Sequence, residues 1–281
     1  MENQLSIILV ISVTIINSIV FGYVASNSKN NKTNIAYLIF LAFIILYTIF
    51  DCIIIQLFKT KFQQDIIVKL QAALWMPLSI LFLNFIYIFL RKAKDQLFYL
   101  FSFLSLAGTI VSIITNRVFL GFKDYNLGTM AYTGPWFLYV VFFFILPSAF
   151  YSLFLLAKEG KIFSNYKKYE NNKLEPYLAN QLKILFYGSC LCFLVAIFTN
   201  IFFDEVLGFS GEVHLASLAL SLHGVFLLPA LIKYNFLNRP IEKIGDELFA
   251  NSTDAVLITN QLGIIVNLNK SARNMFKLKG H

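Results

Sequence analysis

Four polar side chains, Asp51, Asn84, Asn200 and His223, interrupt stretches of sequence that are otherwise apolar. A carboxylate and an imidazole can hold or transfer a proton, and the two carboxamides can donate and accept hydrogen bonds. Ionisable groups inside apolar segments are costly and mark ligand or proton sites in membrane proteins. We therefore expect a ligand- or signal-sensing site at these residues. The alternative is hydrogen bonding between packed helices, worth about 1 kcal/mol or less for each pair.

Enzymatic chemistry has no comparable signature in the sequence. The chain contains no Gly-rich phosphate-binding loop and no recognisable catalytic constellation. Its three cysteines, Cys52, Cys190 and Cys192, lie in apolar segments without metal-ligating neighbours, which predicts buried, reduced thiols. We expect no enzyme activity, no metal and no cofactor.

The elements that must position the polar residues follow from composition. Of the 281 residues, 58% are hydrophobic and only 14% are charged, whereas a soluble domain has about 25% charged residues. The sequence therefore predicts a polytopic membrane protein whose first partner is the lipid bilayer. The formal net charge of +8 would suggest nucleic acid in a soluble protein. Because the cations lie between apolar runs, membrane topology explains them and no nucleic-acid partner is expected.

Seven apolar runs are long enough to cross a bilayer, which takes about 20 residues. They are Leu5–Ala25, Ile35–Phe58, Leu70–Leu90, Leu97–Asn116, Trp136–Ala157, Ile184–Phe203 and Leu215–Ile232. If the second and seventh spans are neighbours, Asp51 and His223 could reach one another. Three spans contain a proline that can kink its helix, at Pro77, Pro147 and Pro229. The sixth helix is expected to begin near Pro176, because proline suits a first helical turn.

Loop charges predict the orientation of these spans. The first, third and fifth loops together carry eleven Lys and Arg residues, against five in the N-terminus and the other loops. Loops rich in Lys and Arg remain in the cytoplasm. We therefore expect an external N-terminus and a cytoplasmic C-terminus.

Composition changes at Lys233, where a polar segment begins. Leu237, Ile241, Ile244 and Leu248 are spaced by four, three and four residues, the seam of a short parallel coiled coil. This signal-linker seam predicts a parallel homodimer. The alternative is an amphipathic linker helix that remains single.

Two short strands and a capped helix are predicted at the end of the chain. Residues 255–259 and 264–267 are rich in β-branched side chains, and the turn between them contains Gly263. Asn269 is placed to cap a following helix in which Ala272, Met275 and Phe276 share one face. Because two strands do not form a stable sheet alone, this module is expected to be incomplete.

The segment 247–272 resembles the opening of a PAS domain. That family typically shows a Ser-x-Asp-Ala entry, a strand, an Asp-x-x-Gly turn, a second strand and an Asn before a helix. The matching positions are Ser252, Asp254, Ala255, Gly263 and Asn269. The chain departs from the pattern at Asn260, where Asp is usual, and covers about a third of such a domain.

The order of parts resembles the N-terminal seven-transmembrane input region of bacterial sensor histidine kinases and related cyclases. The segments that carry the likeness are Trp75–Tyr87 and Leu228–Leu237, followed by the linker and the PAS-like opening. The resemblance implies three parts, which are a sensor region (1–232), a cytoplasmic linker helix (233–249) and an incomplete PAS-like segment (250–281). It also implies a location in the inner membrane of a bacterium and a role in two-component signal transduction.

The sequence as a whole predicts an all-α membrane protein, a seven-helix bundle with a short, incomplete α+β segment. Its expected function is a sensory input module for an unknown small ligand or membrane signal, with a kinase or cyclase output domain outside this chain. A small seven-helix transporter is the alternative, although no internal repeat supports it. A retinal-binding photoreceptor would need a Lys inside the last span, which has none.

Overall fold

The computed structural model describes most of the predicted membrane region and two stretches of the tail. The described residues are 2–27, 32–57, 61–125, 128–164, 175–198, 251–259 and 265–276, with Ala219, His223, Gly224, Phe226 and Phe249. The chain forms two compact units, Met1–Leu237 and Asn238–His281. Asn200, Gly263, Pro229 and the linker seam of Leu237, Ile241, Ile244 and Leu248 lie outside the described residues.

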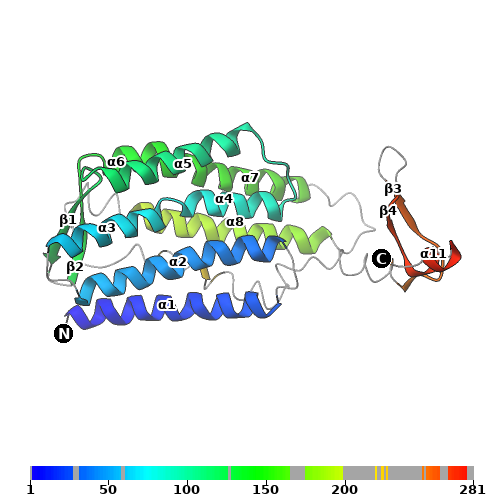
Figure 1. Cartoon of the computed structure of the whole chain (residues 1–281), viewed down its shortest axis with the longest axis horizontal. Helices are drawn as coiled ribbons and strands as arrows, with labels where there is room; N and C mark the ends of the chain where they lie inside the picture. Colours follow the sequence, from blue (N-terminus) through cyan, green and yellow to red (C-terminus); the bar gives the residue numbers. More distant parts are fainter. Residues whose placement is uncertain are drawn as a thin grey trace. The chain divides into compact units, whose positions relative to one another are not determined.

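The first unit is mostly helical, with its long helices side by side (Figure 1). Its elements in chain order are α1 (Glu2–Asn27), α2 (Lys32–Leu57), α3 (Lys61–Trp75), α4 (Leu78–Phe89), α5 (Gln96–Ile114), β1 (Phe119–Tyr125), β2 (Gly128–Thr133), α6 (Phe137–Val140), the π-helical turn η1 (Val141–Ile145), α7 (Leu146–Ser164) and α8 (Glu175–Ile197). The predicted start of the sixth helix near Pro176 is confirmed by α8.

Four helical segments among the described residues are long and apolar enough to cross a membrane. They are Lys32–Phe50, Ile66–Phe89, Gln96–Ile114 and Phe137–Glu159, and two shorter apolar helices cover Val10–Ser26 and Gln181–Ile197. These six segments correspond to the first six predicted spans. Within the seventh, the described residues Ala219, His223, Gly224 and Phe226 are helical.

The outward faces of these helices are apolar, as expected where lipid is the solvent. Ile8, Ile11, Ile15 and Ile19 form an exposed row along α1 at a spacing of three or four residues. Phe103 on α5 is 66% exposed and Phe143 in η1 is 64% exposed. In water such surfaces would favour aggregation, so the exposed side chains and the helix lengths together indicate a membrane protein.

Two prolines interrupt regular helix, as predicted. Pro77 separates α3 from α4, and the chain keeps helical hydrogen bonds on both sides, from Met76 N to Ala72 O and from Leu81 N to Pro77 O. Pro147 stands in the first turn of α7, directly after the wider turn η1. Because proline cannot donate a backbone hydrogen bond, a change of helical geometry beside each proline is expected.

A β-hairpin joins α5 to α6, where the sequence predicts only a loop. Strands β1 and β2 pair antiparallel from Phe119 opposite Thr133 to Tyr125 opposite Gly128. Gly134 closes the hairpin by donating from its N–H to Val118 O. A Cβ on Gly134 would lie 2.1 Å from Arg117 O, so only glycine fits there. The hairpin lies at the end of the unit where α1 begins and α2 ends (Figure 1).

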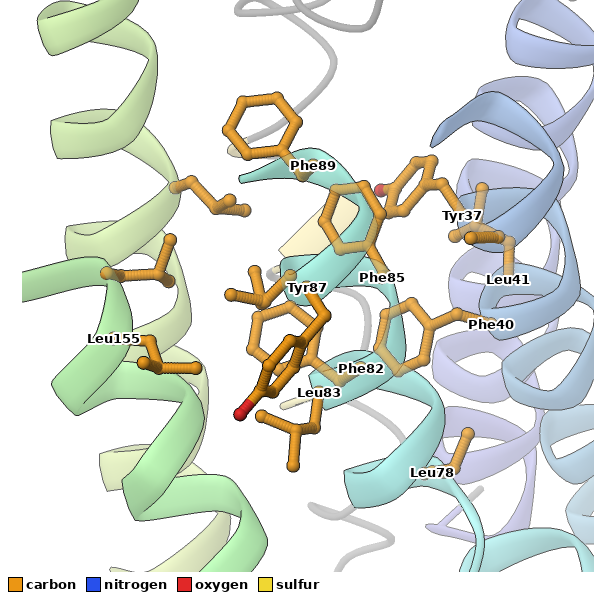
Figure 2. Packing of buried hydrophobic residues seen from close by; sticks show 14 of the residues in the cluster. Tyr37, Phe40, Leu41, Leu78, Phe82, Leu83, Phe85, Tyr87, Phe89 and Leu155 are labelled. Atoms are coloured by element: carbon orange, nitrogen blue, oxygen red, sulfur yellow. The ribbon is translucent and has the colours of Figure 1, made fainter. Parts of the chain in front are cut away.

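The core of the first unit is built around α4, eight of whose twelve residues are buried. This helix packs against α2 on one side and α7 on the other. Figure 2 shows Phe82 and Phe85 of α4 facing Tyr37 and Phe40 of α2. The Tyr37 and Phe85 rings are 5.0 Å apart at their centroids. Aromatic packing of this kind adds about 0.5–1.5 kcal/mol for each pair beyond simple burial.

Asp95 fixes the connection between α4 and α5. Its carboxylate caps α5 by accepting a 2.9 Å hydrogen bond from Phe98 N and a second, also 2.9 Å, from the Tyr151 hydroxyl of α7. The Tyr87 hydroxyl of α4 donates in turn to Tyr151 at 3.4 Å. Desolvation acts to raise the pKa of Asp95, but hydrogen bonds from Tyr87, Phe98 N and Tyr151 outweigh it and lower the pKa below its usual value.

The second unit contains the strands β3 (Leu257–Thr259) and β4 (Ile265–Leu268) and the helix α11 (Lys270–Met275). The strands pair antiparallel, with Leu257 opposite Leu268. The predicted strand pair and capped helix are therefore confirmed. Of the three residues expected to share a helix face, Ala272 is buried, whereas Met275 and Phe276 are exposed.

Candidate functional site

The candidate site is a cavity of about 140 Å³ inside the first unit. Its walls come from α2, the junction of α3 and α4, the segment α6–η1–α7, α8 and the helical residues Ala219 and His223. Aromatic rings supply much of the lining, namely Phe40, Trp75, Phe82, Phe137 and Phe193. Trp75 is held by stacking on Phe137, with centroids 5.8 Å apart and planes inclined by 8°. The cavity is therefore predominantly apolar.

His223 borders the cavity and is only 5% exposed. Its imidazole meets Phe40 and Phe82 edge to face, with centroids 5.4 and 5.6 Å away, and lies 6.1 Å from the Tyr37 ring. Aromatic rings surround its carbon skeleton but offer no good acceptor or donor to its two nitrogens. The imidazole is thus surrounded by aromatic rings, as an apolar ring at this position would be.

Three polar side chains at the cavity lack hydrogen-bond partners among the described residues. They are His223, at both Nδ1 and Nε2, and the hydroxyls of Ser79 on α4 and Ser189 on α8. These residues are 5%, 5% and 1% exposed, so solvent does not reach them freely. A buried polar group without a partner costs about 1–3 kcal/mol, and three at one cavity point to an occupant that would satisfy them.

The helical residues Ala219, His223, Gly224 and Phe226 lie among several helices of the bundle. Gly224 allows a close approach to α1, since a Cβ there would lie 2.8 Å from Asn17 Oδ1. Gly188 of α8 lies close to Phe226, because a Cβ added to Gly188 would be 3.3 Å from the Cβ of Phe226. Small residues permit such close helix packing in membranes. His223, Gly224 and Phe226 thus contact α2 and α4, α1, and α8, respectively.

Of the four polar residues predicted for a site, the structure describes the surroundings of His223 and Asn84, while Asn200 lies outside the described residues. His223 lines the cavity, whereas Asn84, half-buried on α4, is absent from its described lining. Asp51 lies on α2, and its side chain is outside what the structure describes. His223 packs beside Phe40, eleven residues before Asp51, which corresponds to about 16 Å along the helix. Because the side chain of Asp51 is not described, its approach to His223 stays a prediction.

Sequence reasoning missed the two serines and the aromatic wall of the site. Ser79 and Ser189 carry no sequence signal of their own, because serine is common in membrane helices. Trp75 gave a weak signal by preceding Met76-Pro77, where the helix is interrupted. Cys192 also borders the cavity, but no group of three or more metal-ligating side chains gathers among the described residues.

In the second unit, Asn269 joins the start of α11 to the segment before β3. Its Oδ1 accepts from Val256 N at 3.0 Å and from Ala272 N at 2.8 Å. Its Nδ2 donates to Asp254 O at 2.8 Å and to Ser252 O at 3.3 Å. Three of the predicted motif positions, Ser252, Asp254 and Asn269, are thus brought together by hydrogen bonds. The side chain of Asn269 is 2% exposed, so its role is structural.

Comparisons with known proteins leave the family of the chain open. No protein-family model matches the sequence. No curated protein matches it significantly either.

Proposed function

We propose that the chain is the membrane-embedded sensory input module of a bacterial signal-transduction protein. In this proposal the bundle receives a small ligand or a membrane signal. The change passes through the segment that contains His223 to the linker and the PAS-like unit, and from there to an output region. The N-terminus lies outside the cell and the second unit lies in the cytoplasm.

The observation that carries the proposal is the placement of the helical residues Ala219, His223, Gly224 and Phe226. This segment touches the cavity through Ala219 and His223, and it contacts α1 and α8 through Gly224 and Phe226. It is also the last described part of the first unit before the second unit begins at Asn238. An element that meets a site at one end and leads to another module is suited to carry a two-state change.

The second unit supports the same proposal through its local structure. A strand pair followed by a helix capped by Asn269 is the arrangement that the resemblance to a PAS opening implies. A transporter has no evident use for such a unit.

The proposal is tested by joining residues 1–281 to a histidine-kinase catalytic core and measuring autophosphorylation in membranes. Gly224→Val should change the output about threefold or more, because the added side chain must displace Asn17 or the segment itself. Gly22→Val is the matched control, since nothing lies within 4 Å of the position of its Cβ. Equal output from both variants and the unmodified chain, at equal abundance, would contradict the proposal.

The orientation is tested separately with alkaline phosphatase, which is active only outside the cytoplasm. A fusion at Gly211, in the sixth loop, should be active and a fusion at Gly245, in the tail, should be inactive. The opposite pattern would invert the proposed topology and place the second unit outside the cell.

A further inference from the structure

We propose that the cavity beside His223 binds one small, uncharged aromatic molecule that carries a hydroxyl group, a ligand of the phenol class. The proposal that this ligand is the signal rests on the proposed function. The binding itself rests only on the size, lining and unpaired polar groups of the cavity.

The size of the cavity sets the first limit. An apolar cavity of about 150 Å³ in another protein holds one benzene molecule, and this cavity measures about 140 Å³. One six-membered ring therefore fits in this volume. The rings of Phe40, Phe82 and Phe193 offer edges and faces against which an aromatic ligand would pack.

The unpaired polar atoms set the second limit. Benzene would fill the volume but would leave His223, Ser79 and Ser189 without partners. A hydroxyl group both donates and accepts, so a phenol could satisfy an imidazole nitrogen and a serine hydroxyl at once. A saturated acyl chain has no such group, which argues against a lipid tail as the occupant.

Charge sets the third limit. Among the described residues that line the cavity none is charged. A carboxylate or an ammonium group would enter without a counter-ion, which is strongly unfavourable in an apolar site. The ligand is therefore neutral, and benzoate-like acids or aromatic amines in their charged forms are excluded.

The test uses 4-fluorophenol as the probe and the full chain in lipid nanodiscs, with binding followed by fluorine NMR. Empty nanodiscs give the background from partition into lipid. Fluorobenzene is the matched apolar probe, and 4-fluorobenzoate is the matched charged probe. We expect saturable binding of 4-fluorophenol, about three- to tenfold tighter than fluorobenzene, the contribution of about one hydrogen bond. We expect no saturable binding of 4-fluorobenzoate.

Variants locate the binding. His223→Leu should reduce the preference for 4-fluorophenol over fluorobenzene to about twofold or less, because the hydrogen-bonding nitrogens are lost. Ala149→Phe, which adds a ring from the cavity wall, should abolish the binding of both probes. Ser112→Ala is the control, because it also removes a buried hydroxyl without a described partner, but away from the cavity. If Ala149→Phe does not fold, Ala219→Leu is the second variant that adds volume at a residue lining the cavity.

Three results would overturn the proposal. These are no saturable binding of 4-fluorophenol, equal binding of 4-fluorophenol and fluorobenzene, or binding that neither His223→Leu nor the cavity-filling variant changes. The kinase fusion separates this proposal from the proposed function. Binding without any effect of 4-fluorophenol on output would leave the site established and remove its role as the signal receptor. A failure of the Gly224→Val test would reject the input module and leave the binding site untouched.

Discussion

The two units of this chain are stabilised in opposite ways. In the first unit the core cluster is aromatic and aliphatic, and three polar groups at the cavity lack partners among the described residues. In the described part of the second unit, the buried carboxamide of Asn269 has both its oxygen and its nitrogen engaged in hydrogen bonds, while Leu257, Ile265 and Phe276 are exposed. Packing thus organises the bundle, whereas hydrogen bonding organises the tail.

This difference separates structural polar residues from functional ones. Asn269 and His223 are about equally buried, at 2% and 5% exposed. Asn269 makes four hydrogen bonds, so its contribution to stability accounts for a polar side chain at this buried position. His223 makes none among the described residues and adjoins a cavity, and on these two observations we propose that an occupant supplies its partner. Burial alone would not have distinguished the two residues.

The largest expected effect tests the role of packing in the bundle. Phe85 is fully buried, and its ring contacts those of Tyr37 and Phe89. Phe85→Ala should lower the free energy of unfolding by about 3–5 kcal/mol through the cavity it leaves. The measurement is unfolding by SDS in mild detergent. Phe103→Ala, at a position 66% exposed, should stay within about 0.5 kcal/mol of the unmodified chain. A similar loss of unfolding free energy in both variants would contradict the conclusion that packing around α4 stabilises the bundle.

The next effect tests hydrogen bonding in the second unit. Asn269→Ala should destabilise this unit by about 2–3 kcal/mol, because it removes a helix cap and leaves Val256 N and Asp254 O without their partner. Amide hydrogen exchange at Val256 and Ala272 should accelerate about thirtyfold or more.

Asn267→Ala is the control for Asn269→Ala. The Asn267 side chain accepts an exposed hydrogen bond from Leu268 N, and its loss should change exchange at Val256 by less than about threefold. If both substitutions accelerated exchange equally, the hydrogen bonds of Asn269 would not be what stabilises the second unit.

Much of this arrangement follows from the sequence. Long apolar runs predict the helices, the Pro176 region predicts the start of α8, and Asn269 predicts the cap of α11, because each depends on local chemistry. The β-hairpin between α5 and α6 was missed, because residues 119–133 were assigned to a loop between two apolar runs and the pairing of β1 with β2 was not considered. For the candidate site, His223 was predicted from its polarity alone. Ser79 and Ser189 were not, because only helix packing brings them to the same cavity.

Removing a polar group at the cavity should raise the free energy of unfolding, the opposite of the two effects above. In protein free of added ligand, His223→Leu should raise the free energy of unfolding by about 1–2 kcal/mol, because a partnerless polar group is replaced by an apolar one. The measurement is again unfolding by SDS. A loss of stability would mean that the imidazole nitrogens already have partners, and the comparison with Asn269 would fail.

Two serines on α5 provide a matched control, because one has a hydrogen-bond partner among the described residues and the other has none. Ser105 and Ser112 are both 3% exposed and stand seven residues apart on one helix face. Ser105 donates to Met76 O at 3.4 Å, whereas Ser112 has no described partner. Ser105→Ala should therefore be less stable than Ser112→Ala, by about 0.5–1 kcal/mol.

The smallest expected effect depends on pH and concerns the connection between α4 and α5. Because folding lowers the pKa of Asp95, its contribution to stability is complete above the unfolded value of about 3.9 and is lost as the pH falls through the folded pKa. Between pH 6 and pH 3, Asp95→Asn should lose less stability than the unmodified chain. Identical slopes would show that the hydrogen bonds from Phe98 N and Tyr151 do not favour the charged carboxylate.

The central claim is that the segment around His223 passes a change to the linker, and disulfide cross-linking in membranes tests it most directly. With the native cysteines changed to Ala, Ile244→Cys should cross-link to a second copy faster than Glu242→Cys, as a parallel seam requires. Adding Gly224→Val should change the Ile244→Cys rate about threefold or more, while adding Gly22→Val should leave it unchanged. Equal rates at both positions, unaffected by either substitution, would contradict the account.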